Sequence, residues 1–525
     1  MLTATETAAA LAAVAQAEIG GAPGACLSTL GPGVTSSVNG VACAWLERAP
    51  LLVFTDSQPI TAIGIFEHQR IDHRALLAPV TKWSATLSPD NADAIVREAI
   101  DRAMTAPRGP VHIDCPGDVL SAPVQRLRTI QSRELLADRP AESLARPEAE
   151  NRSAASLALL EAETRALLDP EALAPLLSAA RRPLLLVGLG ARRPLDAEAI
   201  LALCAHRGLP ALVTYKAKGV VPDADPHFAG VLTNGALERP LIAEADLLLG
   251  VGLDPVELIP RPWTYPQTIV QIGPSRVSTD HIPFAAQLVT DIPSGLELAA
   301  SLLQPSAWDL DAIHRALVAQ RERLCPRSDR LTADRVVQIV ADAAAGRARV
   351  TVDAGAHMFP ATMLWPVAEP NGMLISNGLS TMGFALPAAI GAALAGRAGA
   401  PGAIHDHDRP VIALTGDGGL LMCSGELLTA VRERLHIVVI VFADASLSLI
   451  DIKQRQRGLQ PAGVGLGTIN WCALAASMGA AAHGAGTAAN LKAALATALA
   501  ARGPTVIEAR IDPSTYSETL HTIRG

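Results

Sequence analysis

Two segments decide the fold: PVIALTGDGG at residues 410–419 and IVVIVFADAS at residues 437–446. Each begins as a continuous apolar run, typical of strands buried on both faces of a parallel sheet, and residues 425–435 between them have a helical pattern. The carboxyl ends of parallel strands meet at one edge of the sheet, where ligands bind in open α/β folds. We therefore expect the carboxylates of Asp417 and Asp444 to lie close together at that edge.

The same alternation of apolar runs and helical patterns divides the whole chain into three blocks. This predicts an α/β fold class with three doubly wound parallel-sheet domains. The expected boundaries are 1–125 for the first block, 126–165 for a charged linker, 166–304 for the second block and 330–525 for the third. The expected strands lie within residues 24–30, 50–56, 109–116, 182–190, 209–215, 245–254, 268–273, 348–355, 410–419, 437–446 and 504–512.

The composition excludes several classes of protein. A chain of 525 residues is too long for one core, and its apolar residues are mostly aliphatic, which suits helices packed on buried strands. The net charge of −8 without a basic stripe excludes a nucleic-acid partner. The seven cysteines form no CxxC pair, so we expect a reduced, cytoplasmic protein without zinc or disulfides. No apolar stretch approaches the about 20 residues of a membrane span, so we expect no membrane partner.

The third block carries the chemistry of a metal–diphosphate site. Two carboxylates and a backbone carbonyl are the hard oxygen ligands that Mg²⁺ prefers, and glycines let backbone amides approach a phosphate closely. The strand–GDG–helix–strand–AD unit resembles the motif of thiamine-diphosphate-dependent enzymes of the acetolactate synthase and 2-oxo-acid decarboxylase group. The resemblance implies that Mg²⁺ binds Asp417, Asp444 and the carbonyl of Ser446. Asp444 departs from the family, in which this ligand is usually Asn. The diphosphate would lie against Gly416, Gly418 and Gly419.

Residues 375–394, ISNGLSTMGFALPAAIGAAL, resemble the family segment that lies under the two rings of the cofactor. The resemblance implies that Met382 wedges between the rings and that the carbonyl of Ser380 accepts from the aminopyrimidine. It also places His357 near the diphosphate. By itself, Met382 would be a core residue and His357 a structural histidine.

Glu6 is the candidate for the carboxylate that activates the cofactor. The resemblance implies a Glu, a helix of small residues, a strand and then Gly-Pro-Gly, which correspond here to Glu6, residues 26–29 and Gly31–Gly33. A Glu buried against the pyrimidine nitrogen can hold or share a proton. By itself, Glu6 would be an ordinary first-turn helix residue. The family has a strand, a helix and a second strand ahead of this Glu, so we expect the first block to be short at its N-terminus, with an exposed sheet edge.

A loop at Phe66–Gln69 resembles the one that places a Gln over the reacting carbon. The resemblance implies that His68 and Gln69 position a carboxylate or exchange protons with the substrate. The alternative is a solvent-exposed loop without a catalytic role.

The whole resemblance implies a pyrimidine-binding, a central Rossmann-like and a diphosphate-binding domain, with thiamine diphosphate and Mg²⁺ as cofactors. It implies decarboxylation of a 2-oxo acid with or without carboligation, in a homodimer or homotetramer whose active sites lie between subunits. Two alternatives stay open: a thiamine-dependent C–C lyase and a catalytically silent homologue. Residues that mark specialised subgroups are absent, since Leu258, Ile450 and Lys453 replace them, and no residues typical of a bound FAD are found. Leu447, Leu449 and Ile450 predict an apolar substrate site.

Overall fold

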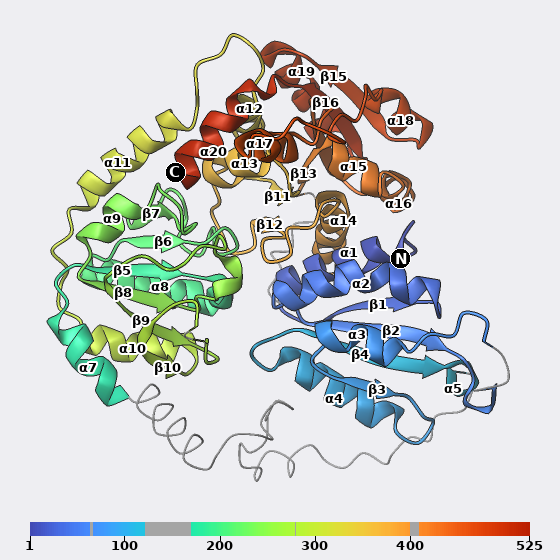
Figure 1. Ribbon diagram of the computed structural model, residues 1–525, viewed down its shortest axis with the longest axis horizontal. Coiled ribbons are helices and arrows are strands. Elements are labelled where there is room, and N and C mark those ends of the chain that lie inside the picture. Colours follow the sequence, from blue (N-terminus) through green and yellow to red (C-terminus); the bar gives the residue numbers. More distant parts are fainter. Residues whose placement is uncertain (63–66, 121–169, 279, 399–408) are drawn as a thin grey trace.

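The computed structural model describes residues 1–62, 67–120, 170–278, 280–398 and 409–525. The expected linker and Phe66 lie outside the described residues. Three parallel sheets, one of four strands and two of six, are each flanked by helices (Figure 1). The predicted fold class of three parallel-sheet α/β domains is confirmed.

The N-terminal domain is built on a four-stranded sheet in the order β1-β2-β4-β3, with β1 at one edge. Its first helix begins at Glu6 because the Thr5 side chain caps it by accepting from the Ala8 amide, and it ends at Gly21 in the left-handed conformation. The helices are α1 (Glu6–Gly20), α2 (Pro32–Leu46), α3 (His73–Leu77), α4 (Ala92–Met104) and α5 (Gly117–Leu120), with the short 3-10 helices η1 (Ile60–Ala62) and η2 (Ala78–Val80). The strands are β1 (Gly24–Ser28), β2 (Leu51–Ser57), β3 (Ser84–Thr86) and β4 (Pro110–Pro116).

The central domain has a six-stranded sheet in the order β10-β9-β8-β5-β6-β7. Its middle strands are apolar on both faces and fully buried. The strands are β5 (Pro183–Val187), β6 (Ala211–Val213), β7 (Phe228–Val231), β8 (Leu247–Val251), β9 (Thr268–Gly273) and β10 (Phe284–Val289). The helices are α7 (Pro170–Ala179), α8 (Pro194–Arg207), α9 (Arg239–Glu244), α10 (Ile292–Leu302) and α11 (Leu310–Arg323), with η3 (Leu189–Ala191) and η4 (Pro255–Glu257).

The C-terminal domain has a six-stranded sheet in the order β12-β11-β13-β14-β16-β15, and the two segments that decide the fold become its neighbouring strands β13 and β14. The strands are β11 (Arg349–Val352), β12 (Met373–Ile375), β13 (Val411–Gly416), β14 (Ile437–Ala443), β15 (Ala481–Ala485) and β16 (Thr505–Arg510). The helices are α12 (Ala333–Ala344), α13 (Met358–Leu364), α14 (Ala385–Ala398), α15 (Asp417–Cys423), α16 (Glu426–Arg432), α17 (Ser448–Gln456), α18 (Trp471–Ser477), α19 (Ala488–Ala500) and α20 (Tyr516–Arg524), with η5 (Pro513–Thr515).

Helix α1 packs directly on α14, which joins the N-terminal to the C-terminal domain (Figure 1). Leu11 and Ala15 share one apolar cluster with Phe384 of the C-terminal domain. The two helices approach so closely that a Cβ on Gly391 would lie 2.1 Å from the carbonyl oxygen of Ala12. Small residues on both helices therefore set this interface.

Among the described residues, no helix is both long and apolar enough to cross a membrane.

Candidate active site

Asp417 and Asp444 lie at the carboxyl ends of the adjacent strands β13 and β14, as the sequence predicts. The Oδ2 atom of Asp417 accepts from the backbone amides of Asp444 at 2.9 Å and Ala445 at 2.6 Å. Asp444 in turn accepts from the Ser446 amide at 3.1 Å and from the Ser448 hydroxyl at 2.6 Å. The two carboxylates are thus fixed in place by the loop that follows β14.

This pair of carboxylates suits a divalent cation. Burial, together with the nearby charge of Asp417, raises the pKa of Asp444 to about 6, and a cation would relieve both effects. Within the described part of the chain, no three His, Cys, Asp or Glu side chains form a group that could hold a metal. A cation at Asp417 and Asp444 would therefore complete its shell with backbone and diphosphate oxygens, as Mg²⁺ commonly does.

Trp471 holds Asp417, a contact that the sequence did not predict. Its indole Nε1 donates to Oδ1 of Asp417 at 2.8 Å, and both side chains are buried. A donor of this kind orients a metal-binding carboxylate from outside the ligand set. Trp471 follows the metal motif by about one helix and one loop, so only the folded structure brings it to Asp417.

Met382 and Leu447 converge over Gly418, the second glycine of the motif. A Cβ at Gly418 would lie 2.5 Å from Leu447 Cδ2 and 2.8 Å from Met382 Cε. The absence of a side chain there is what lets these two apolar groups approach the metal motif. Tight packing also explains the glycine at position 419, because a Cβ added there would lie 2.3 Å from a carboxylate oxygen of Asp353.

His357 presents a buried ring nitrogen that has no hydrogen-bond partner. The ring is 3% exposed, stacks on Phe442 with centroids 5.0 Å apart, and lies against Gly416. Its Nε2 is buried and unpaired, and burial lowers the pKa of His357 to about 4, so the ring is neutral near pH 7. A buried polar atom without a partner is uncommon, and a group bound beside Gly416 would supply one.

Asp353 is a second residue that the sequence did not reveal. It follows β11, accepts from the Thr415 hydroxyl at 2.8 Å and from the Phe384 amide at 3.2 Å, and is fully buried. Burial raises the pKa of Asp353 to about 6 despite these hydrogen bonds. Asp353 joins the ends of two strands to the start of α14. Its signal was present, because it also ends an apolar strand segment, as Asp417 does.

Ser380 and Met382 lie on the segment between β12 and α14. Ser380 has a φ of 53°, a left-handed conformation, and its hydroxyl donates to the carbonyl of Asn377 at 2.9 Å. Its side chain is exposed, whereas Met382 is half-buried beside Gly418. The predicted ring-binding segment therefore lies next to the predicted metal motif.

Glu6 and Gln69 come together at the Gly31–Gly33 turn. A Cβ at Gly33 would lie 3.4 Å from Oε1 of Glu6, and one at Gly31 would lie 3.0 Å from Cβ of Gln69. The carbonyl of His68 accepts from the Gln58 amide at 3.1 Å, while the side chains of His68 and Gln69 are exposed. The predicted site residues Glu6, His68 and Gln69 thus lie at one glycine-rich turn.

A buried network supports this turn from beneath. The Gly31 amide donates to Nε2 of His73 at 3.3 Å, so the ring proton is on Nδ1, which lies 3.2 Å from a carboxylate oxygen of Asp114. Thr55 donates to the same carboxylate at 2.9 Å. Burial opposes ionisation, yet these hydrogen bonds lower the pKa of Asp114. His73 therefore fixes the backbone beside Glu6 and Gln69.

The predicted site residues lie in two domains whose neighbouring residues touch, since the Asn39 side-chain amide donates to Thr381, next to Met382, at 2.9 Å. Among the described residues, no hydrogen bond or ion pair joins the group at the Gly31–Gly33 turn to the group around Asp417 and Met382. The first group belongs to the N-terminal domain and the second to the C-terminal domain.

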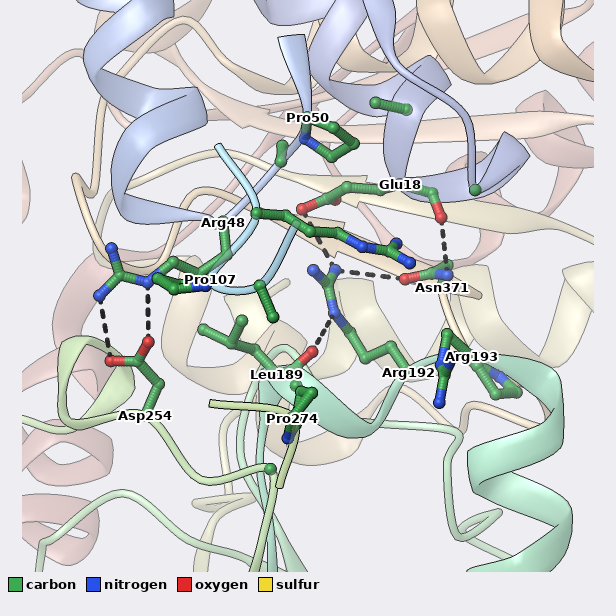
Figure 2. A pocket seen from close by; sticks show the side chains of 18 of the residues that line it. Glu18, Arg48, Pro50, Pro107, Leu189, Arg192, Arg193, Asp254, Pro274 and Asn371 are labelled. Atoms are coloured by element: carbon green, nitrogen blue, oxygen red, sulfur yellow. Dashed lines mark hydrogen bonds and ion pairs between the residues drawn. The ribbon is translucent and has the colours of Figure 1, made fainter. Parts of the chain in front are cut away.

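A cavity of about 580 Å³ lies elsewhere, where the three domains meet (Figure 2). None of its lining residues is a predicted site residue. It opens at the carboxyl ends of the central strands β5, β8 and β9, and Arg48 and Arg192 reach into it. Arg48 pairs there with Asp254 at 2.8 Å, and Arg192 pairs with Glu18 at 3.1 Å.

Comparison with known proteins identifies the family. Residues 1–76 match the thiamine pyrophosphate enzyme N-terminal TPP binding domain, residues 170–298 the central domain and residues 353–509 the C-terminal TPP binding domain. The chain is 29% identical to the acetolactate synthase isozyme 1 large subunit of Escherichia coli, over 97% of this chain and 86% of the relative. It is 29% identical to a catabolic acetolactate synthase of Raoultella terrigena, over 97% and 87%.

A third relative is a probable 2-ketoarginine decarboxylase of Pseudomonas aeruginosa, which is 30% identical over 88% of this chain and 78% of the relative. The three family matches follow one another in the order of the three sheets. The expected cofactors, thiamine diphosphate and Mg²⁺, are confirmed by this membership. The chain belongs to the thiamine pyrophosphate enzyme family and is an acetolactate synthase-like, thiamine-diphosphate-dependent enzyme.

Proposed function

We propose that this enzyme decarboxylates a 2-oxo acid and that the product either leaves or adds to a second carbonyl compound, as in an acetolactate synthase. The observation that carries the proposal is the convergence of Met382 and Leu447 over Gly418, directly beside the paired carboxylates of Asp417 and Asp444. A charged diphosphate end and an apolar reacting end then lie side by side.

The C-terminal group holds the cofactor in this proposal. Asp417, Asp444 and the carbonyl of Ser446 would bind Mg²⁺, His357 would lie beside the diphosphate, and Met382 would support the two rings. Gly416 and Gly418 would let backbone amides approach the diphosphate closely, and the carbonyl of Ser380 would accept from the aminopyrimidine. Thiamine diphosphate supplies the electron sink that takes up the electron pair when the substrate carboxylate leaves.

The N-terminal group handles protons. Glu6 holds a proton at the pyrimidine nitrogen, and the turn at Gly31–Gly33 keeps its carboxylate in place. Gln69 and His68 face the substrate, where an amide can hold a carboxylate and an imidazole can exchange a proton near neutral pH. Leu447 and Leu449, which are half-buried, and the exposed Ile450 would line an apolar substrate site, and water excluded there would favour loss of the substrate's charge as CO₂.

Two copies of the chain complete each active site in this proposal. The proton-handling group and the cofactor-holding group lie on different domains of the chain. A homodimer, or a tetramer of two such dimers, would place Glu6 of one subunit against the cofactor held by another.

CO₂ release tests the proposed reaction. The purified enzyme is incubated with Mg²⁺, thiamine diphosphate and each of several 2-oxo acids, from pyruvate to acids with a basic side chain. We expect CO₂ release that requires the cofactor and falls by at least about a hundredfold in Glu6→Gln, because a side-chain amide cannot take up and release a proton as a carboxyl group does.

The alternatives give different results in the same assay. Tight cofactor binding without CO₂ release, but with cleavage of a 2-hydroxy ketone, would identify a lyase and contradict the proposal. Cofactor binding with neither reaction would identify a silent homologue.

A further inference from the structure

The segment from Ile375 to Met382, which carries Ser380 and Met382, is held almost residue by residue from outside its own domain. From the central domain, Lys216 donates to the Ile375 carbonyl at 2.9 Å. The side chain of Asn377 donates to the carbonyl of Glu257, also in the central domain, at 2.8 Å. The remaining contacts come from one helix of the N-terminal domain.

That helix is α2, and it presents a stripe of polar side chains four residues apart. Such a spacing places Asn39 and Cys43 on one face, and Glu47 follows in the same row at the helix end. Each residue of this α2 stripe reaches one residue of the segment. The contacts are Asn39 Nδ2 to Thr381 Oγ1 at 2.9 Å, Cys43 Sγ to Ser376 Oγ at 3.5 Å, and Glu47 Oε1 to the Gly378 amide at 2.8 Å.

Glu47 differs from the other two because it is a fully buried acid, and burial raises the pKa of its carboxyl group. Its side chain is 1% exposed, and its second oxygen, Oε2, lies 3.3 Å from Nζ of the equally buried Lys216. Lys216 also binds Glu18 at 2.6 Å, and Glu18 in turn pairs with Arg192 (Figure 2). Burying these charges is costly, and apolar residues could join the domains at least as well. Contact between the domains therefore does not by itself explain why an acidic residue is buried at position 47.

We propose that Glu47 is a positioning residue for the cofactor: its carboxylate, anchored by Lys216, holds the Gly378 amide and so sets where Ser380 and Met382 meet the cofactor. This inference rests on the proposed function of Ser380 and Met382.

The backbone near Gly378 shows why such an anchor is needed. Ser380, two residues further on, has a φ of 53°, which a residue with a side chain adopts only when its surroundings hold it. A Cβ at Gly378 would lie 2.9 Å from Cβ of Leu46 and 3.1 Å from Cγ2 of Val256, so the turn fits tightly between two domains. Without Glu47, the half-buried Gly378 amide would lose its acceptor, and the turn would relax.

Cofactor binding by the full-length enzyme tests the proposal. Titration calorimetry with thiamine diphosphate in excess Mg²⁺ measures Kd for wild type, Glu47→Ala, Glu47→Gln and Lys216→Met. We expect Kd to rise at least about tenfold in Glu47→Ala, because the amide loses its acceptor. Glu47→Gln keeps an oxygen for that amide and should recover most of the affinity. Lys216→Met removes the anchor of the carboxylate, so its Kd should lie between those of Glu47→Ala and Glu47→Gln.

Arg48→Ala is the matched control. Arg48 follows the same helix and pairs with Asp254 of the central domain, and among the described residues no hydrogen bond joins it to the segment. We expect this variant to lower Tm as much as Glu47→Gln does while changing Kd less than about twofold. The near-ultraviolet circular dichroism of the bound cofactor should change in Glu47→Ala and Lys216→Met and not in Arg48→Ala, because only the first two alter how the rings are held.

The outcomes separate this inference from the proposed function. A wild-type enzyme that binds no thiamine diphosphate would contradict both. Normal binding by wild type, with Kd and dichroism in Glu47→Ala and Lys216→Met equal to those in Arg48→Ala, would overturn the positioning role alone. If Glu47→Ala does not fold, the comparison of Lys216→Met with Arg48→Ala decides the question.

Discussion

At the scale of single residues, Asp444 makes metal binding depend on pH. Its pKa is about 6, so Mg²⁺ must compete with a proton below that value. We expect the affinity for Mg²⁺ to rise about tenfold per pH unit below pH 6 and to level off above it. Calorimetric titration of the apoenzyme with Mg²⁺ and thiamine diphosphate between pH 5 and 8 measures this. Asp444→Asn should bind with little dependence on pH in this range.

The same substitution predicts a change in stability without metal. Because the folded-state pKa is raised above 3.8, Asp444 favours folding below that pH and this contribution is lost as the pH rises through about 6. Apo Asp444→Asn should therefore be more stable than apo wild type at pH 7.5, by on the order of 1 kcal/mol, and similar to it near pH 4. Equal stabilities at both pH values in urea unfolding would contradict this.

Trp471 gives a second residue-scale prediction. Trp471→Phe keeps the buried ring but removes the donor to Asp417, so the affinity for Mg²⁺ with thiamine diphosphate should fall about tenfold. Trp308→Phe is a matched control, because its indole donates at the same distance of 2.8 Å to the Pro183 carbonyl in the central domain. Equal cofactor affinities in the two variants would show that Trp471 does not orient Asp417.

Sequence could predict residues whose role follows from position on a strand, and it missed those that act from elsewhere. Asp417 and Asp444 end adjacent apolar runs, so their proximity follows from parallel-sheet geometry. Trp471 and His73 come to their partners from loops and short helices, and no local pattern marks them. Asp353 also follows an apolar strand, as Asp417 does, but it lacks the GDGG motif that marks Asp417 as a binding residue.

At the scale of elements, the strands found from sequence were nearly all the interior ones. Every strand that was missed lies at a sheet edge: β3, β7, β10, β12 and β15. Interior parallel strands are buried on both faces and appear as continuous apolar runs, whereas edge strands are shorter or more mixed in composition. The β15 segment, AAHGA, is largely exposed and contains no large apolar residue. The strand β1 is the one edge strand that its sequence revealed.

The contact between α1 and α14 predicts a sharp effect at Gly391. In Gly391→Ala the new Cβ would meet the Ala12 carbonyl oxygen at 2.1 Å, and backbone cannot move aside as a flexible side chain can. We expect a loss of about 1–3 kcal/mol in unfolding free energy. Gly486→Ala, where a Cβ has no heavy atom within 4 Å, should change stability by less than about 0.5 kcal/mol. A denaturant series on both variants would measure this, and equal midpoints would contradict the tight helix contact.

At the scale of the whole molecule, the three domains could be predicted, but the charges that join them could not. Lys216 and Glu18 are 198 residues apart, and Gly378 and Glu47 are 331 residues apart. Lys216, Glu18 and Glu47 each look like an ordinary charged position in their own helix or loop. Only the packing of three domains around one point turns them into a buried cluster.

The separation of the two site groups predicts complementation between inactive subunits. Glu6→Gln and Asp417→Ala each remove one group, so each variant alone should be nearly inactive. After co-refolding or co-expression, mixed dimers should contain one intact active site, giving about a quarter of wild-type CO₂ release if subunits associate at random. No recovery, with mixed dimers present by mass spectrometry, would show that each active site is built within a single chain.

The buried cluster of Glu18, Glu47, Lys216 and Arg192 also limits how this enzyme can evolve by recombination. An exchange of the central domain with that of a relative would replace Lys216 and Arg192 and leave their carboxylate partners behind. A chimaera of that kind would inherit uncompensated charges at the one point where all three domains meet. Lineages that shuffle this domain should therefore change these four positions together, and a designer who transplants it must carry the carboxylates along with it.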